Sequence, residues 1–177
     1  MTADLTYLYF AYGSNMATAR LCRRTSSARP VGIGRLDGHV LRWHKRSRDG
    51  SGKCDAAVDP GGPGGVWGVL YEIALAEKSL LDRVEGLHCG YEEKEVEVVA
   101  RKDRIQVTMY YATEIDAALR PYQWYKDFVV AGAREHSLPP AYRTALESTE
   151  AVPDPDLERT GRNSSILAGR QRVDYSQ

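Results

Sequence analysis

Residues 9–15 read YFAYGSN, and the fold can be worked out from this stretch outward. The run 5–11, LTYLYFA, is almost wholly aliphatic, aromatic or β-branched, which is typical of a buried β-strand. The strand should end at the turn 12–15, where Asn15 is a candidate N-cap for a short helix over 16–23. A glycine-containing turn between a strand and a helix leaves backbone N–H groups free to hold a carboxylate, a phosphate or an oxyanion. The same pattern also fits an ordinary tight turn.

The rest of the chain alternates strand and helix patterns. Strands are predicted at 31–44 (one or two strands), 55–58, 66–73, 91–100 and 105–112. Helical spacing of apolar residues predicts helices at 74–85, 122–135 and 139–147. The stretch 60–65, PGGPGG, cannot form regular structure. This order favours an α+β domain with a mixed or antiparallel sheet, or with that sheet curled into a barrel.

Composition limits the classes of function. The chain has 177 residues, with 24 Lys+Arg against 24 Asp+Glu, so the formal net charge is zero and gives no argument for a nucleic-acid or membrane-surface partner. No apolar run reaches the ~18–20 residues of a membrane span, and the N-terminus lacks the pattern of a secretion signal. We therefore expect a cytoplasmic protein. The chain has eleven tyrosines and two phenylalanines. A tyrosine has an apolar ring and a polar hydroxyl, so it suits a pocket wall whose other side packs in the core.

The composition changes near the C-terminus. From residue 151 onward aliphatic residues become rare, and Pro, Asp, Arg, Ser and Gly dominate. We predict a folded domain over 1–150 and a C-terminal tail over 151–177 that is extended, partly disordered, or ordered only against a partner. The domain should fold without the tail.

Glu85 is the candidate acid or base. It follows Leu81 by four residues, so a helix over 74–85 places it on the apolar face, and Gly86 supplies the helix stop. Burial and the negative end of the helix dipole both disfavour a charged carboxylate, which suits a group that takes and gives protons. The alternative is a solvated glutamate on a fraying last turn. Asp82 should lie on the exposed side.

Other candidate sites are weaker. The four histidines and three cysteines have no metal-ligand spacing, so no metal site is predicted. Ser14 lacks the G-x-S-x-G context of a nucleophile, and the glycines of 60–65 do not follow the dinucleotide-binding pattern. The basic stretch 42–48, RWHKRSR, could contact phosphate, but a solvated surface loop within 45–53 is the favoured interpretation.

Four segments together resemble the gamma-glutamylcyclotransferase-like superfamily. The matching segments are YFAYGSN at 9–15, VWGVLY at 66–71, LDRVEG at 81–86, and Tyr125 followed by GARE at 132–135 and Leu-Pro at 138–139. The resemblance covers about residues 5–147. It implies an α+β fold built as a small mixed β-barrel with flanking helices.

The resemblance also implies an activity and a set of site residues. Such enzymes release 5-oxoproline and a free amine from a gamma-glutamyl-amino acid or gamma-glutamyl amide, by attack of the substrate's own α-amine. Glu85 would be the general acid/base, and no metal or cofactor would be needed. The substrate-binding residues would be Tyr9, Phe10, Ala11, Tyr12, Gly13, Ser14, Asn15, Tyr125, Tyr91 and Tyr110. The expected partner is a small gamma-glutamyl substrate, and a homodimer is compatible with the family. The alternative is a non-catalytic binding module on the same scaffold.

Overall fold

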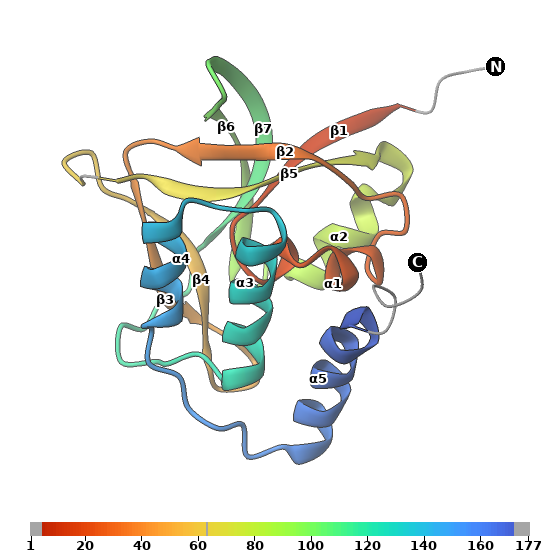
Figure 1. Cartoon of the computed structure of the whole chain (residues 1–177), viewed down its shortest axis with the longest axis vertical. Coiled ribbons are helices and arrows are strands. Elements are labelled where there is room, and N and C mark those ends of the chain that lie inside the picture. The colour runs from red at the N-terminus through yellow and green to blue at the C-terminus, as the bar shows by residue number, and fades with distance from the viewer. Residues whose placement is uncertain (1–4, 63, 172–177) are drawn as a thin grey trace.

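The structure is a computed structural model that describes residues 5–62 and 64–171 (Figure 1). Five strands close into a barrel in the order β1-β5-β2-β6-β7. Their bounds are Thr6–Ala11 (β1), Arg29–Leu36 (β2), Val66–Ala74 (β5), Tyr91–Ala100 (β6) and Asp103–Ala112 (β7). The β1 and β7 strands pair in parallel and the other neighbours are antiparallel, so the predicted mixed barrel is confirmed.

The two remaining strands form a separate hairpin. These strands are β3, His39–Arg46, and β4, Gly52–Val58. The prediction of one or two strands over 31–44 resolves to two, which are separated at Asp37 and Gly38. The stretch 45–53 is not the solvated loop that we expected, because strands enter it from both ends and Lys45 is only 7% exposed.

Helices flank the barrel. They are α1 (Thr18–Cys22), α2 (Lys78–Glu85), α3 (Gln123–Glu135), α4 (Pro140–Glu147) and α5 (Leu157–Gln171), with short 3-10 helices at Ser14–Met16 (η1) and Leu75–Glu77 (η2). Figure 1 shows the β6–β7 hairpin at one end of the molecule and α5 at the other. Gly86 ends α2 in the left-handed conformation (φ 72°), which confirms the predicted helix stop.

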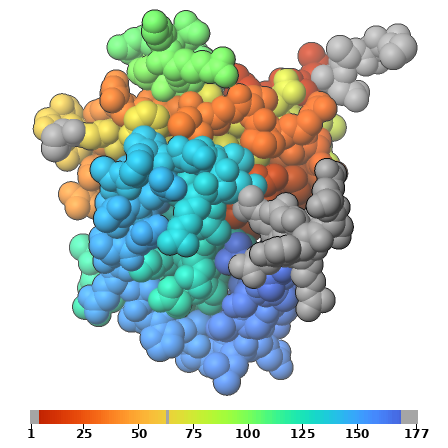
Figure 2. All heavy atoms as spheres, viewed as in Figure 1, coloured from red at the N-terminus to blue at the C-terminus, as the bar shows by residue number. Residues whose placement is uncertain are grey.

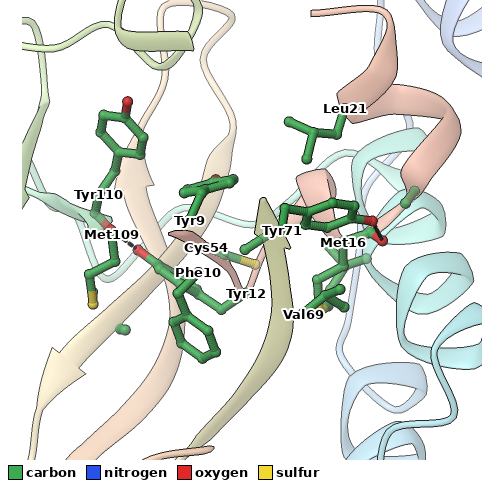
Figure 3. Packing of buried hydrophobic residues seen from close by; sticks show 14 of the residues in the cluster. Tyr9, Phe10, Tyr12, Met16, Leu21, Cys54, Val69, Tyr71, Met109 and Tyr110 are labelled. Atoms are coloured by element: carbon green, nitrogen blue, oxygen red, sulfur yellow. Dashed lines mark hydrogen bonds between the residues drawn. The ribbon is translucent and has the colours of Figure 1, made fainter. Parts of the chain in front are cut away.

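The core joins the barrel to α3. Phe10, Tyr71 and Phe128 are fully buried there, and Figure 3 shows part of this packing from close by. Gly132 brings α3 against η1, since a Cβ at this position would lie 2.4 Å from the carbonyl carbon of Met16. Only glycine allows this close approach of the two backbones.

Two local expectations were wrong. Asn15 does not cap a helix: α1 begins after Ala17, and the Asn15 side chain bonds elsewhere. Residues 157–171 are not an extended or disordered tail, because they form α5, whose Asn163 accepts a hydrogen bond from Arg20 of α1 at 2.9 Å. Residues 172–177 of the predicted tail lie outside the described residues. Figure 2 shows α3, α4 and α5 forming one continuous surface.

None of the helices in the described part of the chain is long and apolar enough to cross a membrane.

Candidate active site

A cavity opens where β1 ends and α2 ends. It holds about 300 Å³ of empty space, counting its open mouth. Its lining contains eight of the predicted substrate-binding residues and the predicted acid/base, together with one residue that the sequence analysis missed, Cys54. The lining residues are Tyr9, Tyr12, Gly13, Ser14, Asn15, Cys54, Glu85, Tyr91, Tyr110 and Tyr125. The sequence therefore identified residues that are far apart in the chain and adjacent in space.

Phe10 and Ala11 lie elsewhere. Both are fully buried in the core and neither lines the cavity. They belong to β1, where they pair with Leu70 and Val69 of β5. Successive side chains of a strand point to opposite faces, so a consecutive motif cannot place every side chain in one pocket.

Glu85 is the carboxylate of the cavity. It is the last residue of α2, and its side chain is 15% exposed. Its Oε1 accepts hydrogen bonds from Asn15 Nδ2 at 2.8 Å and from Arg24 Nη1 at 2.7 Å. Its Oε2 accepts none from the residues that the structure describes. One oxygen is thus held in place by the protein, and the other remains available to a substrate.

Arg24 is a functional candidate that sequence reasoning missed. It follows α1, and its Nη1 also donates to Asn15 Oδ1 at 2.8 Å. The positive charge of Arg24 compensates the negative charge of an ionised Glu85, which the sequence analysis had left without a counter-charge. The three side chains thereby join α1, η1 and α2. No local pattern marks this arginine, because its role depends on how α1 packs against α2.

Four buried phenols line the cavity as neutral groups. Burial raises the pKa of Tyr9, Tyr12, Tyr91 and Tyr125 well above the usual value of 10.0. Two of them donate hydrogen bonds within the protein. Tyr12 donates to the carbonyl of Tyr110 at 2.5 Å, a bond drawn as a dashed line in Figure 3. Tyr91 donates to the carbonyl of Cys54 at 2.7 Å. These bonds fix the walls of the cavity.

The other two phenols accept hydrogen bonds. Tyr9 receives one from Asn15 Nδ2 at 3.0 Å, and Tyr125 receives one from the backbone N–H of Cys54 at 3.0 Å. The Tyr9 hydroxyl donates to no described residue, so its proton is available for an oxygen atom of a bound molecule. The Tyr125 hydroxyl also interacts with the thiol of Cys54, a weak acceptor that an oxygen atom of a bound molecule could replace.

Tyr110 contributes its ring. It lies edge-on to the ring of Tyr9, with 5.8 Å between centroids, while its hydroxyl donates to Asp82 Oδ1 at 2.5 Å. Asp82 also pairs with Lys78, and its side chain is 22% exposed, so it is only partly exposed where we expected it on the exposed side. Burial, followed by this hydrogen bond, raises the pKa of Tyr110.

The turn after β1 supplies backbone donors. The N–H groups of Gly13, Ser14 and Asn15 have no acceptor among the described residues, and all three residues line the cavity. The cavity thus combines a carboxylate with peptide and phenol donors, an arrangement suited to proton transfer beside a polarised carbonyl. The described residues contain no cluster of three or more His, Cys, Asp or Glu side chains placed to hold a metal ion.

Comparisons with known proteins place the chain among related sequences and structures. The AIG2-like family model matches residues 65–146. A mouse protein named gamma-glutamylcyclotransferase is 33% identical over 158 residues, which cover 82% of this chain and 79% of the mouse protein. The human protein of the same name is 32% identical over the same shares. A solved structure named gamma-glutamyl cyclotransferase superposes with a TM-score of 0.78 at 30% identity, covering 84% of this chain and 90% of that one.

Proposed function

The chain belongs to the gamma-glutamylcyclotransferase family and is an enzyme of that type. We propose that Glu85 catalyses ring closure of a gamma-glutamyl substrate to 5-oxoproline. The observation that carries the proposal is the unequal use of the two carboxylate oxygens. Asn15 and Arg24 hold Oε1, while Oε2 faces no partner among the described residues. A general acid/base needs a carboxylate that is held in place and has one oxygen free to take and return a proton.

The reaction needs two proton transfers. The substrate's α-amine attacks the δ-carbonyl carbon, and Glu85 Oε2 takes a proton from the attacking nitrogen. The C–N bond to the leaving amine then breaks, and the same oxygen returns the proton to that amine. The products are 5-oxoproline and a free amine, and Glu85 ends in its starting form. Holding the extended glutamyl chain in a ring-closing shape contributes a proximity effect.

The turn after β1 would bind the charged and polarised oxygens. The peptide N–H groups of Gly13, Ser14 and Asn15 have no acceptor among the described residues, and Tyr9 keeps a proton to donate. The proton of Tyr125 meets only the weak thiol acceptor of Cys54. We assign these donors to the substrate's α-carboxylate and to the oxyanion that forms on the δ-carbonyl. The rings of Tyr12, Tyr91 and Tyr110 would bound the glutamyl chain.

A non-catalytic binding module is the alternative on this scaffold. A binder would need the donors of the turn but not an unoccupied carboxylate oxygen beside them. Glu85 would repel the substrate's own carboxylate, so its presence in the pocket favours chemistry over binding alone.

The test is product analysis with a blocked substrate. We expect the protein to form 5-oxoproline from gamma-glutamyl-alanine and to leave N-acetyl-gamma-glutamyl-alanine intact, because acetylation removes the attacking amine. Release of glutamate from the first compound, or release of alanine from the blocked one, would indicate hydrolysis by water and would contradict the proposal. An inactive protein with both compounds would contradict it for this leaving group, and gamma-glutamyl ethylamide then provides the second trial.

A further inference from the structure

A second cavity adjoins the first. It holds about 610 Å³ of empty space, counting its open mouth, and shares four lining residues with the catalytic pocket: Ser14, Glu85, Tyr91 and Tyr125. We call it the basic vestibule because its other lining residues include Arg20, Arg24, Lys45 and Lys53. Since the two cavities meet at Glu85, a leaving group whose nitrogen is reached by Glu85 can extend into the vestibule.

The vestibule has more positive than negative charge. Two of its cations are paired, Arg24 with Glu85 at 2.7 Å and Lys53 with Asp49 at 2.8 Å. The other two, Arg20 and Lys45, form no ion pair with a described residue. A cavity with two uncompensated cations attracts anions.

Lys45 is the less compensated of the two. Its residue is 7% exposed, and its ammonium donates no hydrogen bond to any described residue. It lies 4.5 Å from the centroid of the Tyr91 ring, a favourable cation–π contact. The carboxylates of Glu85, Glu114 and Asp49 act on it only through space, beyond ion-pair distance. Burying an unpaired ammonium is unfavourable, so this contact alone does not account for its position.

The surrounding structure is shaped around this ammonium. A Cβ at Gly90 would lie 3.1 Å from Lys45 Nζ, and Gly90 has a φ of 104°, which side chains rarely adopt. Lys45 is held by strand β3 and by a bridge to Ile115. The charge is therefore fixed in the cavity wall and not carried on a mobile surface chain.

Arg20 is fixed on the other side. Its Nε donates to Ser14 Oγ at 3.1 Å and its Nη1 to Asn163 Oδ1 at 2.9 Å, which leaves Nη2 without a partner among the described residues. Its guanidinium lies 4.4 Å from the centroid of the Phe128 ring. A preoriented guanidinium with free donors suits a carboxylate.

We propose that Lys45 and Arg20 make the basic vestibule a subsite for an acidic leaving group, so that the enzyme prefers gamma-glutamyl derivatives of acidic amino acids. The proposal rests on the proposed function and adds a substrate preference to it. The departing amine carries two carboxylates in this class, and each free cation can bind one. Lys45 and Arg20 are thus specificity-determining residues.

The test compares substrates that differ in charge. We expect kcat/KM for gamma-glutamyl-glutamate to exceed that for gamma-glutamyl-glutamine, which has nearly the same shape, by about tenfold or more. Gamma-glutamyl ethylamide, with no carboxylate on the leaving group, should be the poorest of the three. Equal values for the glutamate and glutamine derivatives would overturn the proposal, while 5-oxoproline release would still support the proposed function.

A matched pair of variants locates the preference. Lys45→Met keeps the length of the side chain and should remove most of the preference for gamma-glutamyl-glutamate, so that kcat/KM falls much more for this substrate than for the ethylamide. Lys102→Met changes an exposed lysine in the turn between β6 and β7 and should alter neither. If Lys45→Met lowered kcat/KM equally for all three substrates, the assignment of Lys45 to the subsite would be overturned. Because it removes an unpaired buried charge, Lys45→Met should melt no lower than wild type.

A binding measurement separates failure of the subsite from failure of the chemistry. If no substrate yields 5-oxoproline, the proposed function fails, and calorimetry with N-acetyl-gamma-glutamyl-glutamate and its glutamine counterpart decides the subsite. Tighter binding of the glutamate compound, lost in Lys45→Met, would support the anion site. Equal binding of the two compounds would refute it.

Discussion

Arg24 is bound to Glu85: Nη1 of the arginine lies 2.7 Å from Oε1 of the carboxylate, and their side chains are 19% and 15% exposed. The contact is one of two that fix Oε1, because Asn15 donates to the same oxygen. Asn15 also accepts a hydrogen bond from the same arginine nitrogen. The carboxylate is therefore held by one oxygen, with a counter-charge beside it. This geometry determines how the remaining side chains of the pocket can act on a substrate.

Replacement of Arg24 tests this positioning. Arg24→Gln removes the charge and the short bond to Glu85, and we expect kcat to fall about 10- to 100-fold with a smaller change in KM. Arg24→Lys keeps the charge and should recover most of that loss. Steady-state kinetics of the two variants measures the effects on kcat and KM separately. A kcat for Arg24→Gln equal to that of the wild type would show that Oε1 needs no counter-charge.

Gly13 leaves room for the phenol of Tyr125. A Cβ at residue 13 would lie 3.0 Å from the Tyr125 hydroxyl and 3.2 Å from Cys54 Cβ, so Gly13→Ala should destabilise the protein by about 1–3 kcal/mol. Tyr125→Phe removes the crowded oxygen. A double-mutant cycle on urea unfolding should therefore show a smaller cost of Gly13→Ala in the Tyr125→Phe background. Additive costs would mean that the two side chains do not compete for this space.

Removal of the C-terminal segment should change the stability of the protein and its KM for acidic substrates, but not its ability to fold. The buried core residues lie between Tyr9 and Leu146, so we expect a chain ending at residue 150 to fold cooperatively. It should melt at a lower temperature, because Trp124 Nε1 loses its 2.7 Å bond to Asp154. It should also show a raised KM for acidic substrates, since Arg20 loses Asn163.

Calorimetry and kinetics on the truncated chain check both expectations. A truncated chain without a cooperative melting transition would contradict the division at residue 150. An unchanged melting temperature would contradict the stabilising contacts of α5.

Acid stability should depend on Asp49. Burial acts to raise its pKa, but the hydrogen bond and charge of Lys53, with help from Ser51, lower it to about 2. A carboxylate with a depressed pKa contributes stability above its unfolded value of about 3.9, and this stability is lost as the pH falls toward 2. Since the side chain is 14% exposed, we expect a contribution of about 1–2 kcal/mol at pH 7.

Urea unfolding of Asp49→Asn measures this contribution. The difference in unfolding free energy from wild type should be largest above about pH 5 and should shrink as the pH falls through 3. A difference that stays constant from pH 7 to pH 3 would mean that the carboxylate is not stabilised by Lys53.

Local patterns predicted the elements and part of the site. The apolar run of β1, the alternation of β6 and the helical spacing before Gly86 were sufficient to locate the strands and the end of α2. Glu85 could be chosen because its distance from Leu81 places it on the buried face of one helix. These signals lie within a few residues of each other in the chain.

The remaining features depend on tertiary packing. Arg24, Cys54 and Lys45 reach the cavities only because α1 and the β3–β4 hairpin pack beside the barrel. The polar, basic sequence around Lys45 is typical of a surface loop, and its burial follows from long-range contacts such as that with Tyr91. The composition after residue 150 likewise suggested disorder, whereas Asp154 and Arg159 pair at 2.6 Å beside Trp124 at the start of α5.

The most direct test of proton transfer by Glu85 is the rate of 5-oxoproline release by Glu85→Gln. The glutamine has nearly the same shape but cannot take and return a proton, so we predict that kcat falls by about 100-fold or more while the melting temperature changes little. Glu92→Gln, a change at a carboxylate of β6 outside the cavity, serves as the matched control and should retain wild-type turnover. Turnover by Glu85→Gln within about threefold of wild type would contradict the assignment of proton transfer to Glu85.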